Sequence, residues 1–500
     1  HIFLPREELI EKVVAELGAR ESLVEHALDV LERDKRIARE LLEPGANGKP
    51  DYIGVYLSRF HHCESKTAFY LRRLLNSPKT VVFKTPEETV ARESKSLGIT
   101  LAPMQEKAAV AATKAKALVI TGGPGTGKTT IIKAIIKTFA AEKAKILLAA
   151  PTGRAAKRMA EATGMDAKTI HRLLEYSPRS DRFERDEDNP LACGLLVVDE
   201  ASMMDSQLFY HLLKALPLGA TLVLVGDVHQ LPSVGPGNVL GDIIDSRVLP
   251  VVELNEIFRQ SAESEIVCNA HLINNGKLPQ MENSPNKLSE FYFIPKENPE
   301  EAADLIVDLI KNHIPRRFGF DAINEVQLLT PMHKGAVGSE KMNARLQSAL
   351  NPNAQEVRKG ERVFRLHDKV MQIRNNYDKD IFNGDIGRII YINASEKTLS
   401  VDFDGVIMPY EFDELDELVP AFAISIHKSQ GSEYPAVVIP IMMQHYMLLQ
   451  RNLVYTGVTR GKKLVVMVGE KKALAIAIKN NSTSKRYTWL ARRLAIGEEI

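Results

Sequence analysis

Apolar runs alternate with amphipathic segments over the middle of the chain. The runs lie at 117–121, 146–150, 195–199 and 222–226, and segments of helical periodicity lie between them at 128–141, 153–161 and 208–216. Short, nearly continuous apolar runs are typical of strands that are buried on both faces of a parallel sheet. The alternation therefore predicts an α/β unit with crossover helices over residues 96–250.

A second α/β stretch follows and is interrupted by a segment of different texture. Runs typical of buried strands recur at 326–330, 422–425, 436–441 and 464–468. Between them, residues 366–418 form short stretches of alternating polarity with turn residues at Asn383-Gly384 and Asp404-Gly405. We predict a second α/β unit made of residues 251–365 and 419–500, with a small β-barrel inserted at 366–418.

The first 95 residues are predicted to form a separate helical module. Leu9, Val13, Val14 and Leu17 share one face of an amphipathic helix. A helix, strand and turn pattern after residue 31 would suit a winged-helix-like unit. A collar with a packing role only is an equally good interpretation.

Composition restricts the class of protein. The chain has 500 residues, of which 44% are hydrophobic and 26% are charged, so it should fold into about three domains. The 65 basic and 64 acidic residues leave a net charge of +1, so a polyanionic partner would need a local groove of positive charge.

The sequence also bears on location and metal content. The longest apolar runs, 195–198 and 437–443, are far shorter than the roughly 20 residues that cross a bilayer. Cys63, Cys193 and Cys268 are scattered, which argues against a disulfide framework and a structural zinc site. We expect a cytoplasmic protein without a membrane segment or structural metal, from which an upstream piece has been removed, since the chain begins with His.

A glycine-rich segment follows the first predicted strand and opens the first predicted helix. It reads Gly122-Gly123-Pro124-Gly125-Thr126-Gly127-Lys128-Thr129-Thr130 and has the GxxxxGK[ST] spacing. The glycines allow backbone N–H groups to surround phosphates, Lys128 can reach the β- and γ-phosphates, and the Thr129 hydroxyl can ligate magnesium. The segment predicts a site for ATP and Mg²⁺.

Two carboxylates end a neighbouring strand. Asp199 and Glu200 follow the run at 195–198, at the sheet edge that also carries the phosphate loop. Asp199 suits the magnesium ion, and Glu200 suits the orientation and deprotonation of an attacking water, so hydrolysis is expected. A cap for the next helix is the alternative use of this pair.

A third strand ends in Gly226-Asp227 and is followed by Gln230, whose amide can sense the γ-phosphate. Together with Asp199-Glu200-Ala201-Ser202-Met203 and Gln230-Leu231-Pro232-Ser233-Val234-Gly235, this resembles the RecD-type DNA helicases of superfamily 1B, specifically the long-form members outside the RecBCD complex. The resemblance extends from about Gln105 to Lys463. It implies two RecA-like domains with parallel sheets, an inserted SH3-type β-barrel, a β-hairpin pin and the N-terminal helical module.

The resemblance implies further contacts with the nucleotide. Gln105 would hydrogen-bond adenine, unless it is a solvated helix residue. Gln430 and Gly431 would approach the γ-phosphate, and Glu433 would approach the ribose. Arg259 and Arg460 would reach the γ-phosphate across the cleft, although Gly461-Lys462 stands where the family usually has Ala-Lys after the second arginine.

The resemblance also implies a path for a nucleic-acid strand. In the first domain it would be contacted by Pro151, Thr152, Gly153, Arg154 and His171. In the second domain and at the barrel entrance the implied contacts are Thr330, Met332, His333, Asn376, Lys428 and Ser429. Arg154 has a structural role as its alternative.

Residues 176–190 are rich in charge and interrupt the first α/β unit. Relatives hold a strand-separating hairpin there, and a disordered surface loop is the equal alternative. The resemblance implies an ATP-dependent translocase on single-stranded DNA and a DNA helicase, moving 5′ to 3′ in recombination or repair. Expected partners are single-stranded DNA and single/double-strand junctions, with a monomer as the working form.

The nearest rival is a superfamily 1 motor on RNA or RNA–DNA hybrids. A nucleotide-controlled switch and a small-molecule kinase are less favoured, because no NKxD guanine reader is present and Gln230 favours a motor. Protein partners and the role of residues 1–95 cannot be derived from the sequence.

Overall fold

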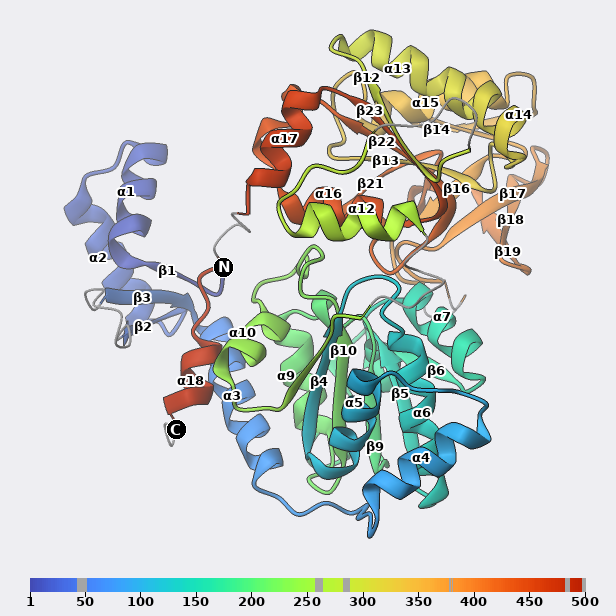
Figure 1. The fold of residues 1–500 in the computed structure, drawn as a ribbon. Helices are drawn as coiled ribbons and strands as arrows, with labels where there is room; N and C mark the ends of the chain where they lie inside the picture. Colours follow the sequence, from blue (N-terminus) through green and yellow to red (C-terminus); the bar gives the residue numbers. More distant parts are fainter. Residues whose placement is uncertain are drawn as a thin grey trace.

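The computed structural model describes residues 1–42, 52–256, 264–281, 288–376, 379, 381–481 and 486–496. Two α/β units lie one above the other, and a small module with the chain's N-terminus lies beside the lower unit (Figure 1). The predicted α/β class with parallel sheets is confirmed.

The first α/β unit is built on a six-stranded parallel sheet in the order β11-β4-β10-β9-β5-β6. Its strands are β4 (Ala117–Gly122), β5 (Ile146–Ala150), β6 (Ala167–Thr169), β9 (Leu195–Val198), β10 (Thr221–Gly226) and β11 (Val251–Leu254). Every residue of β4, β9 and β10 is buried. Because helices cover both faces of the sheet, these strands have no solvated face, and this burial explains the continuous apolar runs of the sequence.

The helices of this unit connect the strands and cover the sheet (Figure 1). They are α5 (Pro103–Lys114), α6 (Lys128–Ala141), α7 (Gly153–Thr163), α8 (Ile170–Leu173), the 3₁₀ turn η1 (Ala201–Met203), α9 (Ser206–Ala215) and α10 (Val239–Ser246). A short antiparallel hairpin, β7 (Tyr176–Ser177) and β8 (Arg182–Phe183), lies between α8 and β9. The hairpin is therefore present, and its action as a pin stays a prediction.

The second α/β unit has a five-stranded parallel sheet in the order β12-β23-β22-β13-β21. Its strands are β12 (Phe291–Pro295), β13 (Val326–Thr330), β21 (Ala423–Ser425), β22 (Tyr434–Ile441) and β23 (Gly461–Gly469). Its helical segments are α12 (Glu265–Asn274), α13 (Pro299–Asp308), η2 (Leu309–His313), α14 (Ile314–Phe318), α15 (Ser339–Leu350), η4 (His427–Ser429), η5 (Met443–Leu448), α16 (Arg451–Val458) and α17 (Lys471–Lys479). The sheet therefore draws strands from both sides of the inserted segment.

The inserted segment forms an antiparallel five-stranded sheet in the order β19-β18-β17-β16-β20. Its elements are the ribbon β14 (Glu356–Lys359) and β15 (Arg362–Arg365), then β16 (Lys369–Gln372), β17 (Ile386–Asn393), β18 (Thr398–Phe403), β19 (Val406–Glu411), η3 (Phe412–Glu417) and β20 (Leu418–Pro420). Along β18 buried and partly exposed residues alternate strictly, as expected for a sheet with one solvated face. Its buried face belongs to a separate core that includes Ile389, Leu399 and Tyr410.

The amino-terminal module contains a three-stranded antiparallel sheet as well as helices. Its elements are β1 (Phe3–Pro5), α1 (Arg6–Leu17), α2 (Glu21–Arg33), β2 (Ile37–Leu42) and β3 (Tyr52–Leu57). The next two helices, α3 (Ser58–Leu75) and α4 (Pro86–Ser96), pack against α9 and α6 of the first α/β unit. The expected boundary near residue 95 thus falls after two helices that already cover that unit.

The C-terminal segment returns to the first α/β unit. Helix α18 (Leu490–Ile496) packs against α10 and α3. Its Arg493 pairs with Glu64 at 3.3 Å, and Glu64 is fully buried on α3. The segment 486–496 was expected with the second unit, as part of 419–500, and in the structure it contacts the first.

Candidate functional site

The phosphate loop joins β4 to α6 at the carboxyl edge of the first sheet. Gly125 and Gly127 have φ angles of 73° and 78°, a left-handed conformation that favours glycine, and Thr126 Oγ1 donates to the Gly123 carbonyl at 2.9 Å. The Lys128 ammonium donates to the carbonyls of Gly122 and Gly123 at 2.7 and 2.9 Å. The lysine is thus held over the mouth of the loop, where phosphate oxygens would compete for it.

Gln105 lies behind the loop rather than in solvent. It is buried on α5, its Nε2 donates to the Thr126 carbonyl at 3.2 Å, and its Oε1 accepts from the Ala102 N–H at 3.1 Å. Both ends of the amide are therefore used to brace the phosphate loop, and the solvated alternative is wrong. Its contact with adenine stays a prediction.

The carboxylate pair lies beside the loop, at the end of β9. The Glu200 N–H donates to Asp199 Oδ1 at 2.8 Å. Burial, with the negative charge of Glu200, raises the pKa of Asp199 to about 6, while Lys128 and Arg158 act in the opposite direction. Glu200 has a φ of 51°, a left-handed conformation that costs a residue with a Cβ roughly 1–2 kcal/mol. Backbone strain of this kind is typical of functional positions.

Asp227 organises the end of β10. Its carboxylate accepts hydrogen bonds from Gln230 Nε2 at 3.2 Å, from the His229 N–H at 3.0 Å and from the Tyr455 hydroxyl at 2.8 Å. Tyr455 lies on α16, so this last contact joins the two α/β units. The sensor residue predicted from the sequence is therefore anchored at the interface between the units.

Arg460 lies at this interface, with its side chain engaged inside its own unit. It is buried and donates to the carbonyls of Thr456 and Ser432, at 3.2 and 3.0 Å, and to the Thr459 hydroxyl at 3.1 Å. The guanidinium would have to exchange at least one of these acceptors to meet a phosphate. Arg259, the other expected finger, lies outside the described residues.

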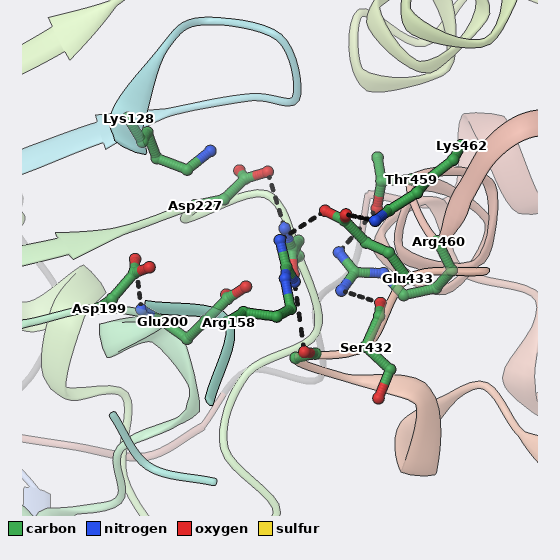
Figure 2. A network of polar contacts seen from close by, with 12 residues as sticks. Lys128, Arg158, Asp199, Glu200, Asp227, Ser432, Glu433, Thr459, Arg460 and Lys462 are labelled. Atoms are coloured by element: carbon green, nitrogen blue, oxygen red, sulfur yellow. Dashed lines mark hydrogen bonds and ion pairs between the residues drawn. The ribbon is translucent and has the colours of Figure 1, made fainter. Parts of the chain in front are cut away.

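A cation that was not expected from the sequence reaches the same interface. Arg158, on α7, pairs with Glu433 at 2.7 Å and donates to the Gly431 carbonyl at 3.3 Å. Lys462 pairs with the other Glu433 oxygen at 3.4 Å. Figure 2 shows Arg158 between Glu433 on one side and Asp199 and Glu200 on the other. The signal in the sequence was slight: Arg158 follows Arg154 by four residues and so shares its helix face.

A groove of about 330 Å³ lies on the other side of the interface. Its lining includes Pro151, Thr152, Gly153, His171, Asn375 and Gln430. Thr152 caps α7 by accepting from the Ala155 N–H at 3.3 Å. Gln430 crosses between the units by donating to the Leu231 carbonyl at 2.7 Å. The structure therefore brings four of the expected nucleic-acid contacts into one groove, together with Gln430, which was expected at the γ-phosphate.

Arg154 is placed differently from its neighbours on α7. Its guanidinium donates to the Ser432 hydroxyl at 2.8 Å and to the Tyr434 hydroxyl at 3.1 Å. Both acceptors belong to the second α/β unit, so Arg154 links the units in this conformation. This geometry favours the structural role that the sequence left open.

The second α/β unit carries a larger cavity of about 740 Å³. Among its lining residues are His333, Lys428, Lys359 and Arg362. Burial lowers the pKa of Lys428. The cavity lies between the second sheet and the inserted barrel, and its lining combines the basic residues Lys359, Arg362 and Lys428 with the acidic residues Glu340 and Glu361.

Three other expected contacts are engaged elsewhere. Thr330 donates to the Met332 carbonyl at 3.0 Å, and the buried Ser429 donates to the Ile426 carbonyl at 2.7 Å. Asn376 donates to Glu417 at 3.3 Å inside the barrel. These side chains stabilise the turns that carry the cavity walls.

The hairpin is held by aromatic and ionic contacts. The His171 ring lies 5.7 Å from the rings of both Tyr176 and Phe183. After the hairpin, Glu187 accepts from the Tyr70 hydroxyl and pairs with Arg73 at 3.0 Å, both on α3. These contacts between the hairpin segment and α3 could not be predicted from the sequence, because their partners lie 117 and 114 residues apart.

Three family models match successive parts of the chain. They are an AAA domain at 105–236, an ATP-dependent RecD-like DNA helicase SH3 domain at 342–403, and a UvrD-like helicase C-terminal domain at 420–468. The RecBCD enzyme subunit RecD of Mycobacterium tuberculosis is 30% identical over an alignment of 410 residues, and the alignment covers 75% of this chain and 70% of that subunit. The chain belongs to the RecD-like DNA helicase family.

One further relative and one solved structure are similar to this RecD-like chain. The ATP-dependent RecD2 DNA helicase of Deinococcus radiodurans is 34% identical over 440 residues, and the chain spans 58% of its length and is itself covered to 88%. Among solved structures, Bacteroides Pif1 bound to single-stranded DNA is 22% identical, with a TM-score of 0.46, over 74% of this chain and 92% of that one. The predicted RecD-type resemblance and the SH3-type inserted barrel are confirmed.

In the part of the chain that the structure describes, no helix is both long and apolar enough to cross a membrane. The same residues contain no cluster of three or more His, Cys, Asp or Glu side chains that could hold a metal ion.

Proposed function

We propose that this RecD-like chain is an ATP-dependent translocase on single-stranded DNA and a DNA helicase. The observation that carries the proposal is the arrangement of the interface between the α/β units. The phosphate loop, the carboxylate pair and Gln230 lie at this interface. Gln430, which crosses the interface to the Leu231 carbonyl, also lines the groove. A change at the phosphates would therefore move the walls of the groove.

Hydrolysis would use groups of both units. Lys128 would bind the β- and γ-phosphates, and Glu200 would orient the attacking water and accept its proton. The donor set of the Thr129 hydroxyl and the Asp199 carboxylate consists of hard oxygens and fits Mg²⁺, which would neutralise the phosphate charge when bound. Gln230 would contact the γ-phosphate, and its hydrogen bond to Asp227 would connect that contact to Tyr455 of the second unit.

Arg460 would supply positive charge to the transferred phosphoryl group when the units close, and its exchange of acceptors would couple hydrolysis to that motion. The second expected arginine, Arg259, is proposed for the same role. Gln430 and Gly431 are proposed beside the γ-phosphate and Glu433 beside the ribose. In that case the Arg158–Glu433 pair would open as the nucleotide enters.

The single strand of DNA would run from the groove at α7 to the cavity beside Lys428. Pro151, Thr152, Gly153 and His171 would contact its phosphates and bases in the first unit, because a helix N-terminus and a nearby imidazole suit such contacts. His333 and Lys428 would do so in the second, with Thr330, Met332, Asn376 and Ser429 shaping the turns around them. The hairpin beside His171 would separate the duplex.

We also propose a working monomer, 5′ to 3′ travel, and a cytoplasmic role in recombination or repair. The proposed domain division is 1–95, 96–250, 251–365 with 419–500, and 366–418. In this division α3 and α4 brace the first RecA-like domain, and the segment 486–496 ties the end of the chain back to it.

Strand displacement on tailed duplexes tests the proposal. A DNA duplex with a 5′ single-stranded tail should be unwound in the presence of ATP and Mg²⁺, and a 3′-tailed or blunt duplex should not. The same duplex with an RNA tail distinguishes the rival motor. Equal or better unwinding on the RNA tail would favour an RNA substrate, and no unwinding on any tail would refute the helicase.

A further inference from the structure

A histidine of the second α/β unit faces the phosphate loop of the first. His271 lies on α12, which packs against α16 at the lower face of the second unit, toward the first sheet (Figure 1). A Cβ atom built on Gly123 would lie 3.4 Å from His271 Cε1 and 3.6 Å from Nε2. The imidazole of the second unit therefore lies beside Gly123, together with the Tyr455 hydroxyl, which is 3.0 Å from the same Cβ position.

The nitrogen that faces the loop has no hydrogen-bond partner. His271 Nε2 is buried and is one of the few buried side-chain polar atoms without a partner in the described part of the chain. A ring turned by 180° would exchange Cε1 and Nε2, so either orientation presents a nitrogen to the loop. A buried donor without a partner is costly, and a ligand, water or ion is one kind of group that can satisfy it.

The neighbouring protein groups are already engaged. Burial lowers the pKa of His271, while the charge of Asp227 acts in the opposite direction. The Asp227 carboxylate already accepts from Gln230, His229 and Tyr455. The Gly122 and Gly123 carbonyls accept from Lys128. These acceptors are therefore shared with other donors, whereas the terminal phosphate of a bound nucleotide would bring additional oxygens to the same loop.

The position of helix α12 is fixed by packing. Ile266, Ala270 and Ile273 bury the other face of α12 in the core of the second unit. His271 would therefore move with that unit and approach the loop when the two units close. A side chain on such a helix can distinguish a triphosphate from a diphosphate, because only the former extends beyond the loop toward the second unit.

We propose that His271 binds the terminal phosphate of the nucleotide, with Nε2 donating to a phosphate oxygen. The inference rests on the proposed ATP site and adds a contact from the second unit to those predicted from the sequence. It makes His271 a sensor of the γ-phosphate, in addition to Gln230 on the first unit.

Nucleotide binding to the full chain tests the proposal. His271→Ala, His271→Gln and the control His313→Ala are compared by competition of AMP-PNP and ADP against a fluorescent ATP analogue. His313 is an exposed residue of η2 that pairs with Asp308. His271→Ala should weaken AMP-PNP by about tenfold or more, since a hydrogen bond to a charged group is lost, and should leave ADP nearly unchanged. His271→Gln keeps a donor at a similar reach and should restore most of the loss.

Two further readouts separate this contact from a folding defect and from failure of the proposed function. Binding of a fluorescent oligo-dT and the thermal unfolding midpoint should not change in His271→Gln. Equal weakening of ADP and AMP-PNP, or wild-type affinity for both in His271→Ala, would overturn the proposal. If the wild-type chain itself fails to bind AMP-PNP, the proposed ATP site fails instead.

Discussion

The interface between the two α/β units has two sides that are built in different ways: the nucleotide side, around the phosphate loop, and the DNA side, around the groove at α7 and the hairpin. On the nucleotide side, Lys128, Asp199 and Gln230 follow three adjacent parallel strands, and their partners lie mostly within a few residues. Between the two sides, Gln430 donates to the Leu231 carbonyl over a separation of 199 residues, and on the DNA side Glu187 pairs with Arg73 over a separation of 114 residues. The residues of the nucleotide side are therefore placed by the ends of neighbouring β-strands. Those of the DNA side are placed only when the two units and the amino-terminal module pack together.

The largest effect is expected from Lys128→Ala. Loss of the ammonium removes a charge that stabilises the transferred phosphoryl group, so ATP hydrolysis should fall by at least about a hundredfold. Affinity for a fluorescent oligo-dT in the absence of nucleotide should persist, because the groove does not include Lys128. Lys137→Ala, an exposed lysine on the same helix, is the matched control. Loss of oligo-dT binding in Lys128→Ala would show that the two sides are not separable.

Removal of the hairpin turn tests the DNA side alone. Deleting residues 178–181, or the longer segment 177–189, should abolish strand displacement and spare ATP hydrolysis stimulated by oligo-dT. The shorter deletion keeps Glu187 and its contacts with α3. Unwinding is measured on gels and ATP hydrolysis by a coupled assay on the same samples. Retained unwinding would show that the hairpin does not separate the duplex.

These two changes also show how much of the molecule could be predicted from sequence. The strands, the phosphate loop and the carboxylate pair are local patterns, and both parallel sheets and the inserted barrel agree with them. Other contacts form only when residues distant in the sequence meet. They are the hydrogen bond of Gln105 to the phosphate loop, the pair of Arg158 with Glu433, and the pair of Arg493 with Glu64. No spacing along the chain encodes such meetings, because they are fixed only when the units pack.

A smaller effect is expected from pH, on the nucleotide side. Asp199 has a pKa raised to about 6 by burial and by Glu200, so its carboxylate is protonated at lower pH and cannot ligate a metal ion. Hydrolysis at limiting Mg²⁺ should therefore fall as the pH drops through about 6. In Glu200→Asp the negative charge is kept and the fall should remain, whereas Glu200→Gln should move Mg²⁺ binding to lower pH. A Mg²⁺ affinity that does not change between pH 5 and 8 would contradict this.

The same carboxyl group affects stability with the opposite sign. Its folded-state pKa lies above the ordinary value of 3.8, so the fold favours the protonated form. Without bound metal, this contribution is fully present below pH 3.8 and is lost as the pH rises through about 6. Asp199→Asn should therefore raise the unfolding midpoint of the metal-free chain at pH 7 to 8, as measured by calorimetry. A lower midpoint would indicate that Asp199 is stabilised as the anion.

The smallest effect is expected from Arg73→Ala. Its pair with Glu187 is partly exposed, and such pairs contribute about 0–1 kcal/mol. Unwinding should slow slightly and become less sensitive to salt, while hydrolysis stimulated by oligo-dT stays unchanged. Lys66→Ala on the same helix serves as the control. A loss as large as that caused by deleting the hairpin would make α3 an essential part of the DNA side.

ATP hydrolysis with and without poly-dT, at two salt concentrations, tests the coupling of the two sides most directly. We expect strong stimulation of hydrolysis by DNA, which weakens as salt rises and disappears in Lys128→Ala and Glu200→Gln. Hydrolysis that is the same with DNA, with RNA and without either would contradict it, because the groove would then not communicate with the phosphate loop.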